Sequence, residues 1–315
     1  STGASGTTTM KYGAMKQLVM SLTVVTPSGD VIVTSRRARK TSAGYDLTHL
    51  YVGSEGTLGV ITELTLRVFG IPEAIAAATM QFATVRQAVD GVIEVIQLGI
   101  GVARIELLDS DAVMAVNKYS QTNLPEKVLL LLEFHGSAES NAIDIGAIRE
   151  VLERYSGTDF VQTTDESERR KLWQARHDTA LACRSLVRNA RNFATDVCVP
   201  ISRLSDCIEA TQKDLAESKL FGPIIGHVGD GNFHVVFSVD PDDHSMVERM
   251  EQFHTRLVER ALSMDGTCTG EHGIGLHKME FLRAETGEGA VDMMRTIKRA
   301  LDPHNIMNPG KIFSL

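Results

Sequence analysis

Hydrophobic and polar residues follow two different patterns along the chain, and the change lies near residue 70. Before it, short apolar runs at 21–26, 31–35 and 59–68 are separated by glycine-containing turns. Such punctuation predicts short strands joined by tight loops. After residue 70, longer segments repeat their apolar positions with helical spacing, and strands lie between them. The pattern therefore predicts two structural parts of different composition.

The second part reads as alternating helices and strands. Helices are predicted wherever apolar residues recur three and four positions apart, at 85–98, 111–119, 141–155, 166–184, 201–216 and 243–264. Strands are predicted at 103–108 and at 128–134, the latter almost continuously apolar. This order favours an α+β domain with a sheet covered by helices, and we expect them on one face.

Composition narrows the functional classes. With 315 residues, 43% hydrophobic and 23% charged, the chain can bury a core large enough for two domains. A formal net charge of -8 argues against a nucleic-acid partner. The four cysteines contain no Cys-x-x-Cys pair, so an iron-sulfur motif is not indicated. No apolar run reaches the length of a transmembrane helix.

The segment from Gly226 to His234 carries the strongest chemical signal. A Gly-Asp-Gly-Asn turn between two apolar runs predicts a hairpin that brings His227 and His234 close to one ion. Glu271, in a later glycine-rich loop, supplies a carboxylate, and His272 stands beside it. Two imidazoles and a carboxylate suit zinc and other divalent first-row metals. The alternative is that each histidine is an ordinary strand-end residue bonded to the backbone.

Two loops near the start of the chain are rich in glycine. Gly3, Gly6, Gly53, Gly56 and Gly59 would let the backbone approach a phosphate, a ribose or a flavin ring, because glycine has no Cβ. Tight turns are the alternative interpretation. Neither a Gly-x-Gly-x-x-Gly opening a helix nor a P-loop motif is present, which disfavours a nicotinamide Rossmann domain and a P-loop fold.

Four separated motifs, taken together, resemble a known family. The segments 53–62, 226–234, 270–275 and 308–311 are similar to FAD-linked oxidases of the vanillyl-alcohol-oxidase type, and most similar to the branch of D-lactate dehydrogenase (cytochrome) and the D-type subunit of glycolate oxidase. This resemblance implies that 1–70 is the C-terminal part of a PCMH-type FAD-binding domain. It implies a substrate (cap) domain with the metal site at 71–270, and a return to the flavin domain at 271–315. It also implies that the loop for the FAD pyrophosphate lies outside this chain.

The resemblance assigns roles to individual residues. Those expected around FAD are Thr2, Gly3, Ala4, Ser5, Gly6, Thr7, Glu55, Gly56, Gly59, Ile61 and Asn308. His227, His234 and Glu271 would hold zinc or manganese, which would lower the pKa of the substrate hydroxyl. His272 is the candidate general base, and Arg176 is expected to bind the substrate carboxylate.

Departures from a related enzyme narrow the substrate. D-2-hydroxyglutarate dehydrogenases carry polar or cationic residues where this chain has Ala180, Ala194 and Val236. A second substrate carboxylate would therefore be buried without partners, which is costly. We expect oxidation of a D-2-hydroxymonocarboxylate, D-lactate first, with hydride transfer to flavin N5 and electrons passed to cytochrome c or a quinone-linked carrier.

Other interpretations stay open at this point. A glycolate oxidase of the related type would differ in its substrate and in its partner proteins. A non-catalytic metal-binding fragment would bind metal without flavin, whereas a hydrolytic metalloenzyme is disfavoured because no His-Glu-x-x-His occurs. A homodimer is left open. We expect a mitochondrial location if the source is eukaryotic, and a cytoplasmic or peripheral inner-membrane location if it is bacterial.

Overall fold

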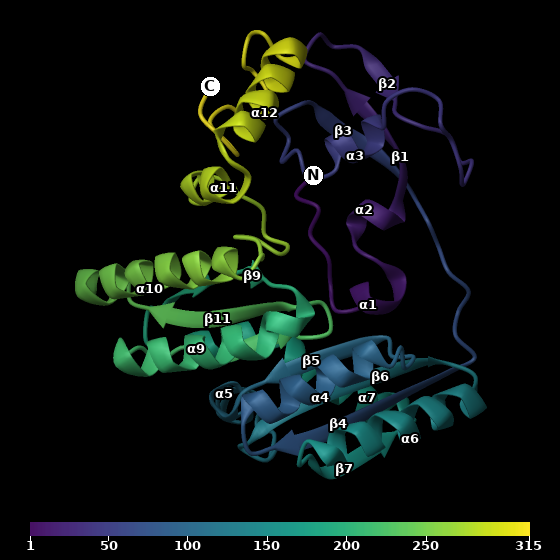
Figure 1. Ribbon diagram of the computed structural model, residues 1–315, viewed down its shortest axis with the longest axis vertical. Coiled ribbons are helices and arrows are strands. Elements are labelled where there is room, and N and C mark those ends of the chain that lie inside the picture. Colours follow the sequence, from purple (N-terminus) through teal and green to yellow (C-terminus); the bar gives the residue numbers. More distant parts are fainter. The chain divides into compact units, whose positions relative to one another are not determined.

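Strand pairing and core packing divide the chain into two units. The computed structural model describes residues 1–315, and most of its elements are labelled in Figure 1. The smaller unit consists of residues 1–70 and 268–315, and the larger consists of residues 71–267. The change of sequence pattern near residue 70 coincides with the first boundary. The assignment of flavin and substrate roles to these segments stays a prediction.

The smaller unit is built on a three-stranded antiparallel sheet in the order β2-β1-β3. Its strands are β1 (Val19–Val25), β2 (Val31–Val33) and β3 (Val60–Leu66). Its helices are α1 (Thr9–Tyr12), α2 (Met15–Leu18), α3 (Leu47–Tyr51), α11 (Met279–Thr286) and α12 (Glu288–Leu301). The buried side chains of its core are Val19, Leu22, Val24, Tyr51, Val52 and Leu58. All three predicted strands of this unit are confirmed.

A buried lysine ties the two sequence segments of the smaller unit together. Nζ of Lys298, on α12, donates to the carbonyl oxygens of Thr57 at 2.8 Å and Met307 at 2.7 Å, and pairs with Asp302. Burial alone would raise the pKa of Asp302, but the Lys298 ammonium and the backbone N–H groups of Met307 and Ile306 lower it. The C-terminal helix is therefore held to the loop before β3 by a fully paired buried charge.

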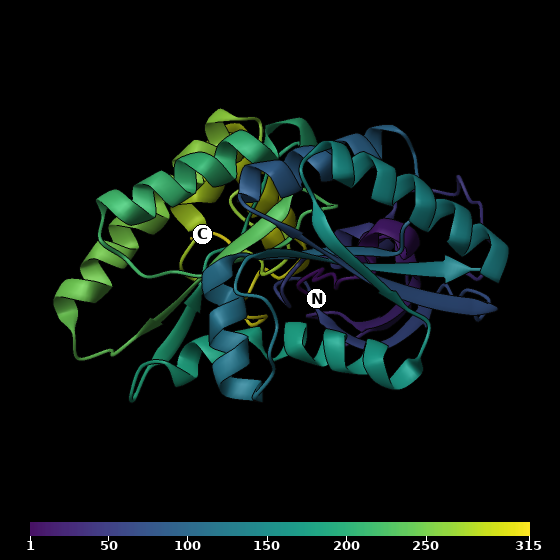
Figure 2. The same cartoon turned by 90° about the horizontal axis from the view of Figure 1, so that it is seen from below.

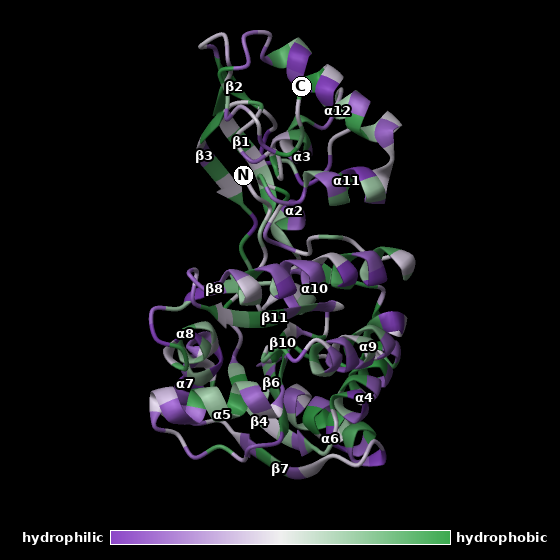
Figure 3. Cartoon of the chain, turned by 90° about the vertical axis from the view of Figure 1, so that its left-hand side faces the viewer, coloured by the Kyte–Doolittle hydropathy of each residue, from purple (hydrophilic) through white to green (hydrophobic).

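The larger unit contains an eight-stranded sheet in which every pairing is antiparallel. The path is β7-β4-β6-β5-β10-β11-β8, and β9 also pairs with β11. Its strands are β4 (Ala74–Phe82), β5 (Arg104–Leu108), β6 (Val128–Gly136), β7 (Thr158–Thr163), β8 (Arg191–Ala194), β9 (Val197–Cys198), β10 (Ile224–His227) and β11 (Asn232–Val239). Figure 3 shows hydrophobic residues concentrated along β11, in contrast to the largely hydrophilic outer side of α10 (His244–Ser263).

Helices cover both faces of this sheet, so the expectation of one covered face is wrong (Figure 2). One face carries α4 (Val85–Gln97), α6 (Ala138–Arg154), α9 (Leu204–Glu217) and α10. The other carries α5 (Ser110–Ser120), α7 (Glu166–His177) and α8 (Thr179–Ser185). The signal is in β6, where Leu129 and Leu131 face α5 while Leu130 and Leu132 are equally buried on the opposite side. A continuous apolar run is typical of a strand buried on both faces.

The predicted helices and strands are otherwise confirmed, with one helix divided. The stretch expected to form a single helix over 166–184 breaks at Asp178 into α7 and α8. The hydroxyl of Thr179 donates to the carbonyl of Arg176 at 2.8 Å, and such back-bonding bends helices. A short 3₁₀ turn, η1 (Ile201–Arg203), precedes α9. Helices of a length and apolarity suited to crossing a membrane do not occur.

The two halves of the large sheet meet at strand β10. Only Ile225 and Gly226 pair with Leu108 and Leu107 of β5, and one more backbone bond joins Asp109 N–H to the carbonyl of Ile224. The side chain of Asp109 reinforces this junction because its Oδ2 accepts from the Ile224 N–H at 2.8 Å. Its Oδ1 accepts from Ala112 N–H at 2.8 Å and caps α5. One buried carboxylate thus fixes both a helix start and the strand beside it.

We expect Asp109→Ala to lower the free energy of unfolding of the larger unit by about 2–4 kcal/mol, because the helix cap is lost and a buried N–H is left without its acceptor. The control Asp243→Ala removes an exposed cap, which accepts only from Met246 N–H, and should cost about 1 kcal/mol. Urea unfolding followed by fluorescence of Trp173, the single tryptophan, measures both. Equal losses in the two variants would contradict the junction role.

Candidate functional site

The predicted hairpin forms and sets the two histidines at its closed end. β10 and β11 pair with His227 opposite Asn232 and Ile225 opposite His234. The chain reverses through a turn in which the Asp230 N–H donates to the His227 carbonyl at 2.9 Å. Gly231 adopts a φ of +79°, and a Cβ there would lie 2.2 Å from a backbone oxygen of Val199. Only glycine fits this turn.

The two imidazoles face each other edge to face. Their ring centroids lie 5.7 Å apart with an angle of 86° between the planes. His234 is 4% exposed, and its Nδ1 lies 2.8 Å from the carbonyl oxygen of Thr195. A carbonyl only accepts, so Nδ1 of His234 donates to it, and in the neutral form of the ring Nε2 then carries the lone pair. A metal ion would therefore be bound through Nε2.

His227 is held by a buried carboxylate that the sequence analysis did not identify. Nδ1 of His227 donates to Oε1 of Glu106 at 2.6 Å. Oε2 of Glu106 accepts from Nε of Arg176 at 2.9 Å and lies 2.8 Å from Nη2 of the same guanidinium. Glu106 lies on β5 and is 0% exposed, and Arg176 lies on α7 and is 8% exposed. Three separate elements thus meet in one buried network.

Side-chain hydrogen bonds also order the region next to His234. Nδ2 of Asn232 donates to Oδ1 of Asp196 at 2.9 Å and to the carbonyl of Val197 at 2.8 Å. The hydroxyl of Thr195 accepts from Val235 N–H at 2.9 Å. These bonds fasten β11 to the segment between β8 and β9, and they fix the carbonyl that orients His234.

Glu271 and His272 belong to the smaller unit, in a loop ordered by another glutamate. Oε1 of Glu271 lies 3.7 Å from Nε2 of His272. The carboxylate of Glu55 accepts from Ile274 N–H at 2.7 Å and from Gly275 N–H at 2.9 Å. Glu55, predicted to lie near FAD, therefore uses its side chain to hold the loop that carries Glu271 and His272.

Several other residues expected near FAD lie close together in the smaller unit. Glu55 and Asn308 both adopt left-handed backbone conformations, and Nδ2 of Asn308 donates to the Glu55 carbonyl at 2.5 Å. A Cβ on Gly56 would lie 3.7 Å from that amide nitrogen, and a Cβ on Gly3 would lie 3.7 Å from Cα of Gly53. The two glycine-rich loops and Asn308 thus form one region of close backbone approach.

Gly59 and Ile61 lie beyond these loops. Gly59 is needed for packing, because a Cβ there would lie 2.8 Å from both Val24 Cγ1 and the Val25 carbonyl of β1. Ile61 is on β3, opposite Val24. The remaining residues expected near FAD, Thr2 to Thr7, precede α1, and there the hydroxyl of Ser5 accepts from Met15 N–H at 3.4 Å. Their roles toward FAD stay predictions.

Comparison with known protein families identifies the family of the chain. Residues 71–312 match the family described as FAD linked oxidases, C-terminal domain. The chain belongs to this family. The predicted family resemblance and the α+β fold are both confirmed.

Proteins that resemble the chain include several named as D-lactate dehydrogenases. The chain is 47% identical to "Probable D-lactate dehydrogenase, mitochondrial" of Danio rerio, with 100% of the chain and 64% of the relative covered. It is 42% identical to "D-lactate dehydrogenase [cytochrome], mitochondrial" of Arabidopsis thaliana, with 99% and 55% covered. It is 33% identical to "Glycolate oxidase subunit GlcD" of Bacillus subtilis, with 97% and 65% covered. The chain therefore spans only part of the length of these relatives.

Solved structures with low sequence identity share the fold. The 4-ethylphenol oxidase of Gulosibacter chungangensis is 16% identical with a TM-score of 0.75, over 97% of this chain and 69% of that one. For p-cresol methylhydroxylase the identity is 14% and the TM-score is 0.75, over 96% and 66%.

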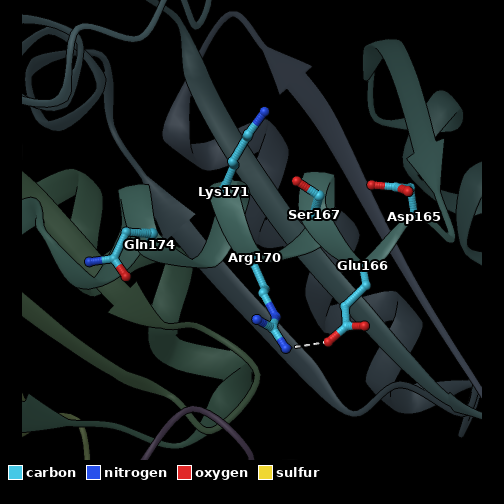
Figure 4. A pocket seen from close by; sticks show the side chains of 6 residues that line it. All are labelled: Asp165, Glu166, Ser167, Arg170, Lys171 and Gln174. Carbon is cyan, nitrogen blue, oxygen red and sulfur yellow. Dashed lines mark hydrogen bonds and ion pairs between the residues drawn. The ribbon is translucent and has the colours of Figure 1, made fainter.

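A surface hollow of about 610 Å³ has none of the candidate site residues in its lining (Figure 4). It is lined by Asp165, Glu166, Ser167, Arg170, Lys171 and Gln174. The side chains of Arg170 and Glu166 form an ion pair there and are 78% and 65% exposed. Exposed, flexible charges of this kind do not preorganise a binding site, so this hollow adds nothing to the candidate site.

The sequence around Glu106 carries a signal that this glutamate is buried and paired. It is flanked by Ile105, Leu107 and Leu108 within an apolar strand. A charged residue in a buried strand requires a partner, and this is a more informative signal than an exposed charge. The partners themselves, Arg176 and His227, could not be read from the sequence because they come from distant elements.

We expect Arg176→Met to lower the free energy of unfolding of the larger unit by about 3 kcal/mol, because Glu106 would keep a buried charge without its main cationic partner. Arg170→Met on the same helix removes an exposed pair and should cost less than about 1 kcal/mol. Urea unfolding with Trp173 fluorescence compares them. A loss below about 1 kcal/mol for Arg176→Met would show that the buried pair contributes little.

Proposed function

We propose that this chain belongs to a FAD-dependent D-lactate dehydrogenase of the cytochrome type, which oxidises D-lactate to pyruvate. The observation that carries the proposal is the pair of facing imidazoles, His227 and His234, each oriented through Nδ1 by a protein acceptor. The 47% and 42% identity to proteins named as D-lactate dehydrogenases supports the same activity.

The donor set fits a divalent metal ion. His227 and His234 present two imidazoles whose Nδ1 atoms are bonded in the manner of metal-binding histidines. Glu271 of the smaller unit is proposed as the third ligand. Nitrogen and oxygen donors of this kind suit zinc and manganese alike. When bound, the metal would act as a Lewis acid toward the substrate hydroxyl and lower its pKa.

Two side chains are proposed to act directly on the substrate. His272 is the general base that takes the hydroxyl proton, since an unperturbed imidazole titrates near neutrality. Arg176 binds the substrate carboxylate. Glu106 takes two of its N–H groups, and a guanidinium has five, so the others can serve the substrate. Fixing the substrate at two points would orient its Cα–H bond.

FAD is proposed to bind along the smaller unit, at Thr2, Gly3, Ala4, Ser5, Gly6, Thr7, Glu55, Gly56, Gly59, Ile61 and Asn308. When bound, FAD supplies the N5 atom that accepts the substrate hydride. The left-handed Glu55 and Asn308 and the paired glycine loops support this placement, because they expose backbone without intervening Cβ atoms.

The proposed preference for a monocarboxylate rests on three apolar side chains. Ala194 on β8 and Val236 on β11 are directly paired across the two strands. Ala180 lies on α8, and its carbonyl accepts from Nδ2 of Asn192 at 2.5 Å. None of these side chains can pair with a second substrate carboxylate, so a dicarboxylate would bind less well.

Glycolate is the second candidate substrate, supported by the 33% identity to a protein named as part of a glycolate oxidase. Electrons are proposed to pass to cytochrome c or a quinone-linked carrier. A mitochondrial location is proposed if the source is eukaryotic, in line with the names of the relatives from Danio rerio and Arabidopsis thaliana.

The test is D-lactate-dependent reduction of an artificial dye by the chain, supplied with FAD and zinc or manganese. Glycolate and D-2-hydroxyglutarate are assayed separately as alternative substrates. We expect D-lactate to be oxidised fastest, and His234→Ala to lower the rate at least about 100-fold because a metal ligand is lost. His244→Ala, at the exposed start of α10, is the matched control and should retain the rate.

The outcomes separate the alternatives. If glycolate is oxidised faster than D-lactate, glycolate becomes the proposed substrate in place of D-lactate. Metal binding without any turnover, although FAD is bound, would contradict the proposed activity of this chain. An unchanged rate in His234→Ala would remove the metal from the proposal.

A further inference from the structure

The carboxylate of Glu106 contacts two residues with different proposed roles. One oxygen accepts from Nδ1 of His227 at 2.6 Å, and the other accepts from Nε of Arg176 at 2.9 Å. The side chain of Glu106 is 1% exposed, that of Arg176 is 9% exposed and that of His227 is 13% exposed. These bonds are therefore shielded from solvent and define one geometry.

A second buried glutamate of the same sheet, Glu133, allows its partners to be compared with those of Glu106. Glu133 on β6 lies 3.1 Å from Nε of Arg104 and 2.7 Å from Nε2 of His135, and it is 4% exposed. Burial would raise its pKa, but His135 and Arg104 lower it. All of these residues belong to the adjacent strands β5 and β6. Glu106 instead joins three elements, β5, α7 and the hairpin strand β10.

We propose that Glu106 is a positioning residue, which fixes the ring of His227 for metal binding while it holds the guanidinium of Arg176. The proposal rests on the proposed function, in which His227 is a metal ligand and Arg176 binds the substrate carboxylate. It adds a residue that touches neither metal nor substrate and that orients both groups that do.

The physical reason lies in the chemistry of a metal-binding imidazole. A carboxylate that accepts from Nδ1–H selects the tautomer with its lone pair on Nε2, sets the rotation of the ring and makes the ligand more basic. A buried carboxylate needs a cation nearby, and the guanidinium of Arg176 supplies it. The same pair of hydrogen bonds therefore makes the buried charge tolerable and fixes the orientation of Arg176 on α7.

The test measures metal binding directly, without turnover. Zinc affinity of the 315-residue chain is determined by competition with a chromophoric chelator, and the absorption spectrum of the cobalt-substituted protein reports ligand geometry. We expect Glu106→Gln to weaken zinc binding about 10–100-fold and to alter the cobalt spectrum. The reason is that the side chain that accepts from Nδ1 of His227 loses its negative charge. Glu133→Gln, equally buried on the same sheet, should change the affinity less than about threefold.

A second pair of variants separates orientation from folding. Glu106→Gln/Arg176→Met removes both charges together, which restores much of the stability lost when one partner is removed. We expect this double variant to fold and still to bind zinc about 10-fold more weakly. Arg176→Met alone keeps the bond between Glu106 and His227 and should retain zinc binding.

The outcomes distinguish this inference from the function on which it rests. If the unaltered chain binds zinc through His227 and His234 but Glu106→Gln and the double variant bind it as tightly as Glu133→Gln, the positioning role is wrong and the metal site stands. If His234→Ala does not weaken zinc binding in the unaltered background, the proposed metal site is wrong and the role of Glu106 falls with it.

Discussion

The short strand β10 is the constraint on which the larger unit depends. Its four residues join the half of the sheet that ends at β5 to the half that begins at β11. A shift of one residue in its register would turn His227 to the opposite face, because side chains alternate along a strand. Glycine is required at position 226, since a Cβ there would lie 2.8 Å from Cβ of Phe233. Asp109 fixes the register from the β5 side through the Ile224 N–H. The fold and the histidine pair therefore share one junction.

The sequence predicted much of this architecture, and its failures have physical causes. The hairpin could be predicted because a Gly-Asp-Gly-Asn turn between apolar runs is a local signal. Strand β4 was not predicted, since Ala76, Ala77 and Ala78 have weak strand preference and become a strand only by pairing with β6 and β7. The break at Asp178 depends on a hydroxyl bond that no periodicity reveals. The histidines of the site were visible for the same local reason as the hairpin, whereas Glu106 gains its meaning only from tertiary contacts.

Buried charge in this sheet is confined to positions where a partner is built in. Glu133 is neutralised by Arg104 and His135 from its own strand and the adjacent one. Glu106 is neutralised by Arg176 from a helix that covers the same face. The two charged partners of Glu133 come from paired strands alone. The Glu106 arrangement requires the helix, the sheet edge and the hairpin to be in place together, so it costs more conformational entropy to assemble. Such an assembly defines geometry at the hairpin more strictly than a local pair could.

The two histidines take their orienting partners from opposite halves of the sheet. His227 is held by Glu106 of β5, and His234 is held by the carbonyl of Thr195, which follows β8. A metal ion bound to both rings would therefore link groups held by the two halves next to β10, which pairs with β5 over only two residues. Because a ligand that binds only the folded state stabilises it by RT ln(1 + [L]/Kd), metal binding would stabilise the folded state that contains this short pairing. The junction positions the two histidines for the metal ion, and the bound metal ion would in turn stabilise the junction. Metal binding and the ordering of the β10–β11 hairpin would then be coupled.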